Sequence, residues 1–306
     1  MRTGRGQVPI LLLAPFVVLF AVFFIFPVLY ALYLSLFVSH GGQNIFVGLQ
    51  NYVQVFQDTA YWSGLLRVIL YGVIQVTIML IVALVLALLL DSDYVKGKAM
   101  FRLIYFLPYA VPGVIAAIMW GFLYAPQLDP LMSLFSAKHP LNLLAQGHVL
   151  AGIINMATWE WAGYNMTIYF ASLTSIPVEL YEAARLDGCS EVQTAIHVKV
   201  PMIRQTIILT VVLSIIGSLQ LFNEPFVLAS LTTISASYTP NMYIYNTAFS
   251  YGNFNYSAAM SVVLAVITFV ASLFFLYMTS EPAPSNKKKV NRAEHPNMNG
   301  VPGEVR

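Results

Sequence analysis

Three polar side chains, Gln220, Asn223 and Glu224, follow one another at i, i+3 and i+4 inside an apolar stretch of the 306-residue sequence. In a continuous helix this spacing places all three on one face. An ionisable side chain costs about 3 kcal/mol in an apolar helix that crosses a membrane, so it normally faces a cavity or a partner. Pro225 disturbs the helix directly after them. We expect this face to present carboxylate and amide groups to a polar solute.

A second polar group lies upstream, in another apolar stretch. Trp161 and Asn165 are four residues apart and share a helix face, while Glu160 and Tyr164 lie on an adjacent face. Aromatic rings beside amides and carboxylates suit a sugar, because its C–H faces stack on the rings and its hydroxyls pair with the polar atoms. Three alternatives stay open. Asn165 and Gln220 hydrogen-bond across a helix bundle and meet no solute, Glu224 lies partly solvated near the outer interface, or Trp161, like Trp159 and Tyr181, is an aromatic residue of the interfacial belt.

The rest of the sequence offers no catalytic or metal-binding set. The five histidines, His40, His139, His148, His197 and His295, have no metal-ligand spacing, and the single cysteine allows no two-thiolate site. No GxxxxGK[ST] sequence, which would cradle nucleotide phosphates, occurs. The net charge of +2, without a basic stripe interleaved with aromatics, argues against nucleic acid. We expect a chain without cofactor or catalytic residues.

Composition indicates the elements that position these side chains. Hydrophobic residues make up 58% of the chain and charged residues 9%, against roughly 45 to 50% and about 25% in soluble domains. This rules out a water-soluble globular protein. Because a membrane-spanning helix needs about 20 apolar residues, we expect an all-α, polytopic membrane protein with six spans, at 10–37, 65–90, 103–125, 149–174, 207–229 and 257–279. Pro27, Pro108 and Pro112 fall inside spans and predict bent helices.

Lys and Arg residues predict the orientation of these spans, because cytoplasmic loops collect them. Six spans place both termini on one side, and thirteen of the 15 Lys and Arg residues fall on that side. The opposite loops hold only Lys138, with Arg67 at the start of the second span. We therefore expect both termini in the cytoplasm, and Gly41, Lys138 and Asn241 outside.

The same pattern divides the chain into four parts. We expect a cytoplasmic N-terminus over 1–9, a first transmembrane helix and outer loop over 10–63, a core transmembrane domain over 64–280, and a disordered cytoplasmic tail over 281–306. The tail is rich in Pro, Asn and charge and has no hydrophobic periodicity. The basic start resembles a signal peptide, but the apolar run behind it is too long, so we expect a retained first helix.

The long cytoplasmic loop, 175–206, predicts two short helices that meet at a corner. Pro177 suits a first helical turn, where its missing N–H is not needed. Gly188 can adopt the left-handed conformation that ends a helix. Ser190, followed three residues later by Gln193, predicts a capping box at the start of the second helix.

The second loop helix carries an apolar stripe. Val192, Ile196 and Val200 recur at helical spacing and must be buried against something. Pro201 should end this helix and open the fifth span. We expect His197 to be a partly exposed contact residue rather than a metal ligand.

These loop residues carry a resemblance to a known family. The string Glu182-Ala183-Ala184, then Gly188, then Val198, Val200 and Pro201 resembles the EAA signature of ABC importer permeases. Val198 and Val200 stand where that signature has Ile and Leu. The stretches 101–120, 163–188 and 218–228 are similar to the sugar-permease branch related to the maltose permeases.

The resemblance implies an ABC importer type I permease fold in the plasma membrane of a prokaryote. It implies that the loop is a coupling helix seated in a cleft of an ATP-hydrolysing subunit, with Glu182, Ala183, Ala184, Asp187, Gly188 and Pro201 as its residues. The implied partners are a second homologous permease, two ATPase chains that bind ATP and Mg, an extracellular solute-binding protein, membrane lipid and a sugar. The substrate path expected from the residues comprises Trp161, Asn165, Gln220, Asn223 and Glu224.

Three other functions compete with import of a di- or oligosaccharide or a glycoside. An importer of another solute, such as a polyamine or phosphate, stays within the class; the outer half lacks clustered basic residues for phosphate. A secondary transporter or channel would depend on an ion gradient rather than on ATP, and the EAA loop argues against it. An integral-membrane enzyme has no readable catalytic set.

Overall fold

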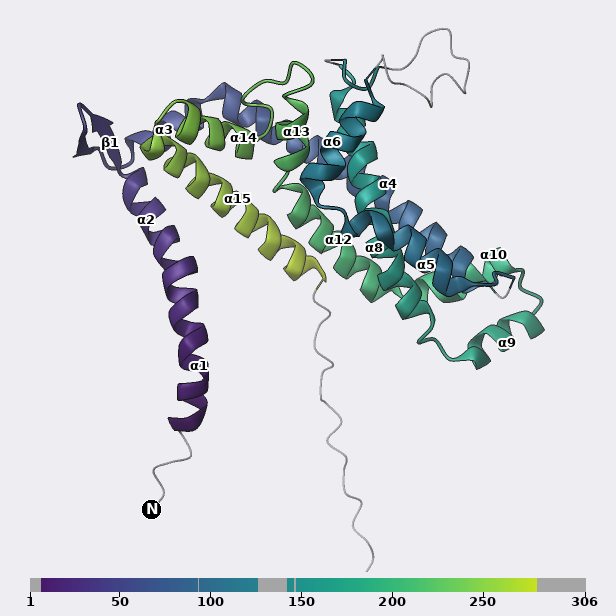
Figure 1. Ribbon diagram of the computed structural model, residues 1–306. Coiled ribbons are helices and arrows are strands. Elements are labelled where there is room, and N and C mark those ends of the chain that lie inside the picture. The colour runs from purple at the N-terminus through teal and green to yellow at the C-terminus, as the bar shows by residue number, and fades with distance from the viewer. Residues whose placement is uncertain (1–6, 93, 126–141, 146, 280–306) are drawn as a thin grey trace, which may run out of the picture.

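The computed structural model describes residues 7–92, 94–125, 142–145 and 147–279, which are mostly helical (Figure 1). The helices α4 (Thr59–Asp91), α8 (Val149–Leu173), α12 (Arg204–Ser218) and α15 (Phe254–Thr279) are long, and α1 (Gln7–Phe20) and α2 (Phe26–Ser35) together form one long stretch. The shorter ones are α3 (Gln50–Gln57), α5 (Lys98–Phe106), α6 (Gly113–Leu123), α9 (Val178–Leu186), α10 (Glu191–Thr194), α11 (Val200–Met202), α13 (Asn223–Leu228) and α14 (Pro240–Tyr245). The predicted tail and Lys138 lie outside the described residues.

Other elements extend or connect these helices. Three π-helical segments, η1 (Ala21–Ile25), η3 (Ala195–Lys199) and η4 (Asn246–Ser250), each continue a helix. The 3-10 segment η2 (Leu107–Ala110) follows α5. Strands β1 (Phe37–His40) and β2 (Gln43–Phe46) pair antiparallel in a small hairpin after α2.

Four helical stretches of the described chain are long and apolar enough to cross a membrane: Leu12–Ser35, Thr59–Asp91, Arg204–Leu228 and Phe254–Tyr277. A fifth would be the pair Lys98–Ala110 and Gly113–Leu123, which is bent by 95°. These stretches match five of the six predicted segments, and α8, with 25 residues, covers the sixth. A mostly helical protein with several apolar spans is thereby confirmed.

The predicted proline bends have two different outcomes. Val111, before Pro112, takes an extended conformation because the proline ring disfavours the helical one, and the helix breaks there. Pro27 bends its helix less, since Leu12–Ser35 runs as one stretch. The π-helical turn η1 ends at Ile25, two residues before Pro27, and widens the helix where the proline removes a donor.

Helices α4, α8 and α12 form the centre of the bundle (Figure 1). Between α8 and α12, the Tyr169 hydroxyl lies 2.6 Å from Thr210 Oγ1, and the Ser172 and Thr206 hydroxyls are 2.8 Å apart. Where α5 crosses α8, a Cβ atom on Gly163 would fall onto the backbone carbonyl of Tyr105. Only glycine permits this approach of two backbones.

A carboxylate ties α4 to the helices at its N-terminal end. Asp58 caps α4 by accepting from the backbone N–H of Ala60 at 2.9 Å, and its other oxygen accepts from the hydroxyls of Tyr243 and Tyr256, both at 2.8 Å. Burial raises the pKa of Asp58, but the hydrogen bonds from Tyr256 and Tyr243 outweigh it and leave this pKa below its ordinary value. Asp58 therefore stays charged and joins α4, α14 and α15.

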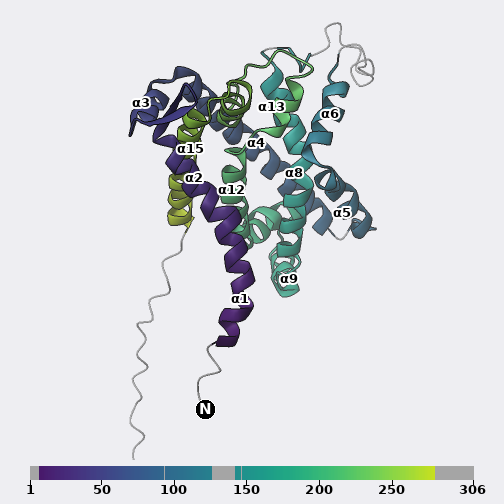
Figure 2. The ribbon, with the colours of Figure 1, turned by 60° about the vertical axis from the view of Figure 1, so that its left-hand side comes forward.

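The first helix stands apart from the bundle. Along Leu12–Ser35, the apolar stretch is exposed within this chain, and Figure 1 shows α1 well apart from α8 and α12, although it overlaps their lower ends in the turned view of Figure 2. In that view the start of α1, the end of α15 and α9 lie toward one end of the molecule, and α3 and α13 lie toward the other. The first and the last described helix thus begin and end toward the same end of the molecule.

Candidate functional site

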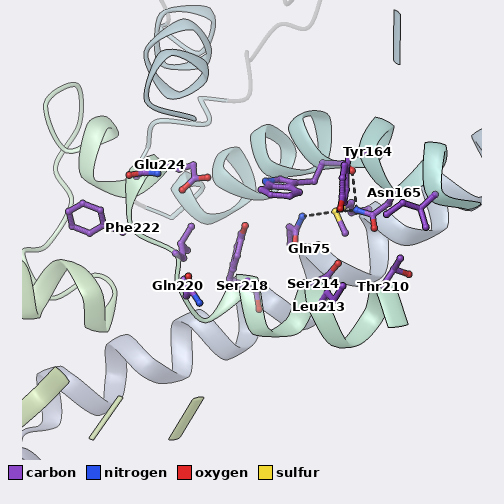
Figure 3. A pocket seen from close by; sticks show the side chains of 17 residues that line it. Gln75, Tyr164, Asn165, Thr210, Leu213, Ser214, Ser218, Gln220, Phe222 and Glu224 are labelled. Atoms are coloured by element: carbon purple, nitrogen blue, oxygen red, sulfur yellow. Dashed lines mark hydrogen bonds between the residues drawn. The ribbon is translucent and has the colours of Figure 1, made fainter. Parts of the chain in front are cut away.

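A cavity of about 320 Å³ lies between α4, α8 and α12 and extends to the chain that leads into α13. Figure 3 shows side chains from all of these elements pointing toward it. The labelled residues that bring polar atoms are Gln75, Tyr164, Asn165, Thr210, Ser214, Ser218, Gln220 and Glu224. Among the described lining residues there is no Lys or Arg, and the one carboxylate is that of Glu224.

Helix α8 supplies an aromatic wall to the cavity. The rings of Trp161 and Tyr164 meet edge to face at 5.9 Å, and Tyr109 stacks on Tyr164 at 4.6 Å. Asn165 is buried beside them, and its amide donates to the Trp161 carbonyl at 3.1 Å and to Met79 Sδ at 3.7 Å. Its donor atom is therefore engaged inside the protein, whereas the Trp161 ring keeps an exposed face.

Helix α4 supplies a wall that sequence reasoning missed. Tyr71, Gln75 and Met79 line the cavity one helical turn apart, and Gln75 donates to Met79 Sδ at 3.4 Å. The sequence carries one signal for this wall, because Gln75 is a single amide inside a long apolar run. A buried polar group in a spanning helix usually has a function or a partner.

The polar group on the fifth predicted span lines the cavity by a different geometry from the one expected. Helix α12 ends at Ser218 and α13 begins at Asn223, with Phe222 outside helical conformation at φ −145°. Gln220 and Asn223 are therefore not on one face of a continuous helix, and that prediction is wrong. The break lies before Pro225, whose backbone nitrogen has no N–H for a helical hydrogen bond. Gln220, Asn223 and Glu224 nevertheless all line the same cavity.

Glu160 lies next to the cavity lining rather than in it. Its side chain is buried, and among the described residues its Oε2 has no hydrogen-bond partner. A Cβ on Gly113 would lie 3.5 Å from Glu160 Oε1 and 3.8 Å from Asn223 Nδ2. Both side chains therefore reach the first residue of α6, where the positive end of the helix favours a carboxylate.

The loop between α8 and α12 has the predicted corner. Helix α9 ends at Leu186, Gly188 takes φ +80°, and Ser190 and Gln193 form both hydrogen bonds of the capping box. The positive φ is accessible to glycine without strain. The second helix is longer than expected, because η3 and α11 continue it past Pro201 to Met202. Pro201 directly follows the π-helical turn η3 and Val200, and this wider turn accommodates the proline where it removes a helical donor.

Most residues implied for the coupling helix face outward. Glu182, Ala183, Asp187 and Gly188 are exposed. Ala184 is buried against its own chain, and its carbonyl accepts from the Cys189 backbone N–H at 3.0 Å. Ala184 therefore packs the corner rather than offering a surface to a partner, which corrects the sequence interpretation.

The apolar stripe of the second loop helix is open within this chain. Val192 is 67% exposed and Ile196 is 59% exposed, and on α9 Leu186 is 89% exposed. His197 is exposed beside them. Leu186, Val192 and Ile196 therefore each expose apolar surface that burial against another molecule would stabilise.

Apolar helices that enclose a polar cavity, with exposed loop helices at one end, are the architecture of a membrane transport protein. The chain matches the family described as "Binding-protein-dependent transport system inner membrane component" over residues 84–283, and it belongs to this family. It is 32% identical to the probable ABC transporter permease protein YurN of Bacillus subtilis (strain 168), over 87% of this chain and 94% of that one. It is equally identical, at 32%, to the lactose transport system permease protein LacF of Rhizobium radiobacter, over 89% and 93% of the two chains.

A solved structure shares the fold. The chain superimposes with a TM-score of 0.78 and 21% identity on a chain of a bacterial alginate ABC transporter in complex with an alginate pentasaccharide-bound periplasmic protein, covering 90% of this chain and 94% of that one. The predicted resemblance to ABC importer permeases is confirmed, and so are the permease fold and the membrane location.

Proposed function

We propose that this chain is the membrane-spanning subunit of an ATP-driven importer that passes a neutral di- or oligosaccharide or glycoside, delivered by a solute-binding protein. The side chains that line the cavity are the main support for this proposal. Trp161 and Tyr164 offer ring faces for sugar C–H groups, while the amides of Gln220 and Asn223 have no hydrogen-bond partner among the described residues. The similarity to the lactose permease LacF supports a carbohydrate without charge.

The charge of the cavity favours an uncharged sugar. Glu224 lines the cavity and Glu160 is buried nearby, and no cationic side chain lines it among the described residues. A phosphate or uronate group would lose its hydration and meet a carboxylate without a compensating cation. Hydroxyl groups can accept from the amides and donate to Glu224.

In this proposal the chain crosses the membrane six times, with α8 as the remaining span and both termini in the cytoplasm. The excess of Lys and Arg on that side supports this orientation. The common end of α1, α9 and α15 in Figure 2 supports an even number of crossings. The exposed apolar surface of α1 and α2 suits contact with lipid or with a second, homologous permease.

Thiol labelling in intact cells tests this topology. In a Cys189→Ser background, a Gln43→Cys variant should react with a membrane-impermeant maleimide without permeabilisation, because Gln43 is exposed in the hairpin expected outside. A Tyr94→Cys variant is the matched control, since Tyr94 is 86% exposed on the side expected in the cytoplasm. It should react only after permeabilisation. The reverse pattern would contradict the orientation.

The loop from α9 to α11 is proposed as the coupling element. Its exposed carboxylates, Glu182 and Asp187, suit Arg or Lys residues of an ATPase chain, and its exposed apolar side chains suit the floor of a cleft. ATP and Mg would be bound by two such ATPase chains. The corner at Gly188 would fix the angle at which the loop enters them.

Apolar substitution tests the solute path. Gln220→Leu and Asn223→Leu should each lower sugar uptake by about fivefold, because a lost hydrogen bond to a solute hydroxyl costs about 1 kcal/mol. The yield of assembled complex and the affinity of the binding protein should stay unchanged. Uptake of several sugars by proteoliposomes, normalised to assembled complex, measures this effect.

Asn165→Leu provides the comparison. Its amide is engaged inside the protein, so this variant should lower the yield of complex first and leave the rank order of sugars unaltered. If Gln220→Leu and Asn223→Leu behaved in the same way, these side chains would be interhelical contacts rather than solute contacts.

A further inference from the structure

A buried ion pair joins the loop to the end of α4. Lys199 Nζ lies 2.6 Å from Asp91 Oδ2, and the two side chains are only 9% and 11% exposed. Lys199 is the last residue of η3, and Asp91 is the last residue of α4, 108 positions earlier in the sequence. The exposed pair of Arg185 and Glu191, at 3.2 Å, stays within the loop and links no spanning helix.

Other contacts concentrate on this pair. The Lys199 ammonium lies 4.9 Å from the centre of the Tyr181 ring on α9, and the Tyr181 hydroxyl donates to the Leu173 carbonyl at the end of α8 at 3.2 Å. Lys98 Nζ donates to the Asp91 carbonyl at 3.2 Å. Burial, and to a lesser degree the Asp91 carboxylate, raises the pKa of Tyr181 to about 12, so its hydroxyl stays a donor. Loop, α4 and α8 therefore meet at one point.

Helix α4 connects this point to the cavity. The helix is continuous over 33 residues, from Thr59 to Asp91, and carries the cavity residues Tyr71, Gln75 and Met79. Met79 is about 18 Å along the helix from Asp91, at roughly 1.5 Å per residue. The end of α4 at Asp91 and this wall of the cavity therefore belong to one unbroken helix.

We propose that the Asp91–Lys199 pair is the joint through which the loop moves α4, so that both act as positioning residues for coupled transport. The inference rests on the proposed role of the loop as the coupling element. Apolar packing between the loop and the bundle can slide, whereas a buried ion pair holds one carboxylate to one ammonium and breaks only at a large cost. The pair therefore makes the end of α4 follow the loop.

A double-mutant cycle in the complete transporter tests the joint. Asp91→Asn and Lys199→Gln should each leave the complex assembled and its ATPase active, while sugar uptake per ATP hydrolysed falls by about tenfold. The double variant should be no worse than either single variant, because each change removes the same interaction. Lys199→Arg keeps the positive charge and should have nearly normal sugar uptake per ATP hydrolysed. The double variant Asp91→Lys with Lys199→Asp exchanges the two charges and should restore this ratio. Lys96→Gln, which removes an exposed charge from the neighbouring loop, is the matched control.

Each other outcome overturns the proposal. Uptake per ATP at the normal value in both single variants would show that the pair transmits nothing. Loss of assembled complex, with a normal ratio in what remains, would make the pair a structural tie only. Additive losses in the double variant would show two independent roles. If the loop did not couple at all, Gly188→Val would keep both normal sugar uptake and normal binding-protein-stimulated ATP hydrolysis, so failure of the joint alone remains distinguishable.

Discussion

Gly163→Ala is expected to reduce the assembled transporter to about a tenth or less of its normal yield. The Cβ of alanine would fall onto the backbone carbonyl of Tyr105 where α5 crosses α8. A backbone carbonyl cannot move aside as a flexible side chain can, so the two helices must separate. Separation would also pull the Trp161 and Tyr164 wall away from the cavity, and we expect a loss above about 3 kcal/mol. Yield and thermal unfolding of the purified complex measure it.

Gly217→Ala is the matched control for this effect on assembly. Gly217 also lies in a central helix, but a Cβ there would meet no heavy atom within 4 Å. Its yield should stay normal, or rise slightly, because alanine favours a helix by about 1 kcal/mol over glycine. A normal yield of Gly163→Ala would contradict the close crossing of α5 and α8.

Gly188→Val is expected to abolish coupled transport while the subunit still inserts and assembles its membrane part. Gly188 has φ +80° at the corner between α9 and α10. A β-branched residue is strongly disfavoured there, and the strain, about 2 kcal/mol or more, is relieved by opening the corner. The exposed faces of both short helices would then no longer fit one partner surface. Sugar uptake and binding-protein-stimulated ATP hydrolysis should both fall by more than about tenfold.

Two further variants distinguish an effect of the Gly188 corner on coupling from a general loss of stability. Gly188→Asn should keep most transport, because asparagine tolerates the left-handed conformation. Gly252→Val introduces the same type of strain at φ +70°, in the turn before α15 and away from the loop. It should leave coupling intact. Normal stimulation of ATP hydrolysis in Gly188→Val would remove Gly188 from the coupling element.

Local rules predict much of this fold. Apolar segments of spanning length mark the positions of the long helices, because burial in lipid depends on composition and length alone. The Gly188 corner and the Ser190 capping box are also local, since each depends on residues within one helical turn. The bend at Pro112 follows from the ring of a single residue.

Features that depend on distant contacts could not be predicted in this way. The helix breaks between Ser218 and Asn223, so Gln220 does not lie on the same helix as Asn223. The prediction that these residues share one face assumed a continuous helix. Ala184 is buried where α9 packs against α10 and η3 across the corner, and the sequence pattern of α9 alone does not show this contact. The Asp91–Lys199 pair joins two elements far apart in sequence, and each residue alone looks like an ordinary loop charge.

The central claim is that ATP hydrolysis, rather than an ion gradient, drives sugar through this permease. The complex should be isolated from its native membrane through this chain and reconstituted in proteoliposomes with ATP on the side of the ATPase chains. Uptake of the sugar held by the binding protein should require ATP and the loaded binding protein, and should persist when ionophores collapse the ion gradients. Uptake that needs a gradient and continues without ATP would contradict the account.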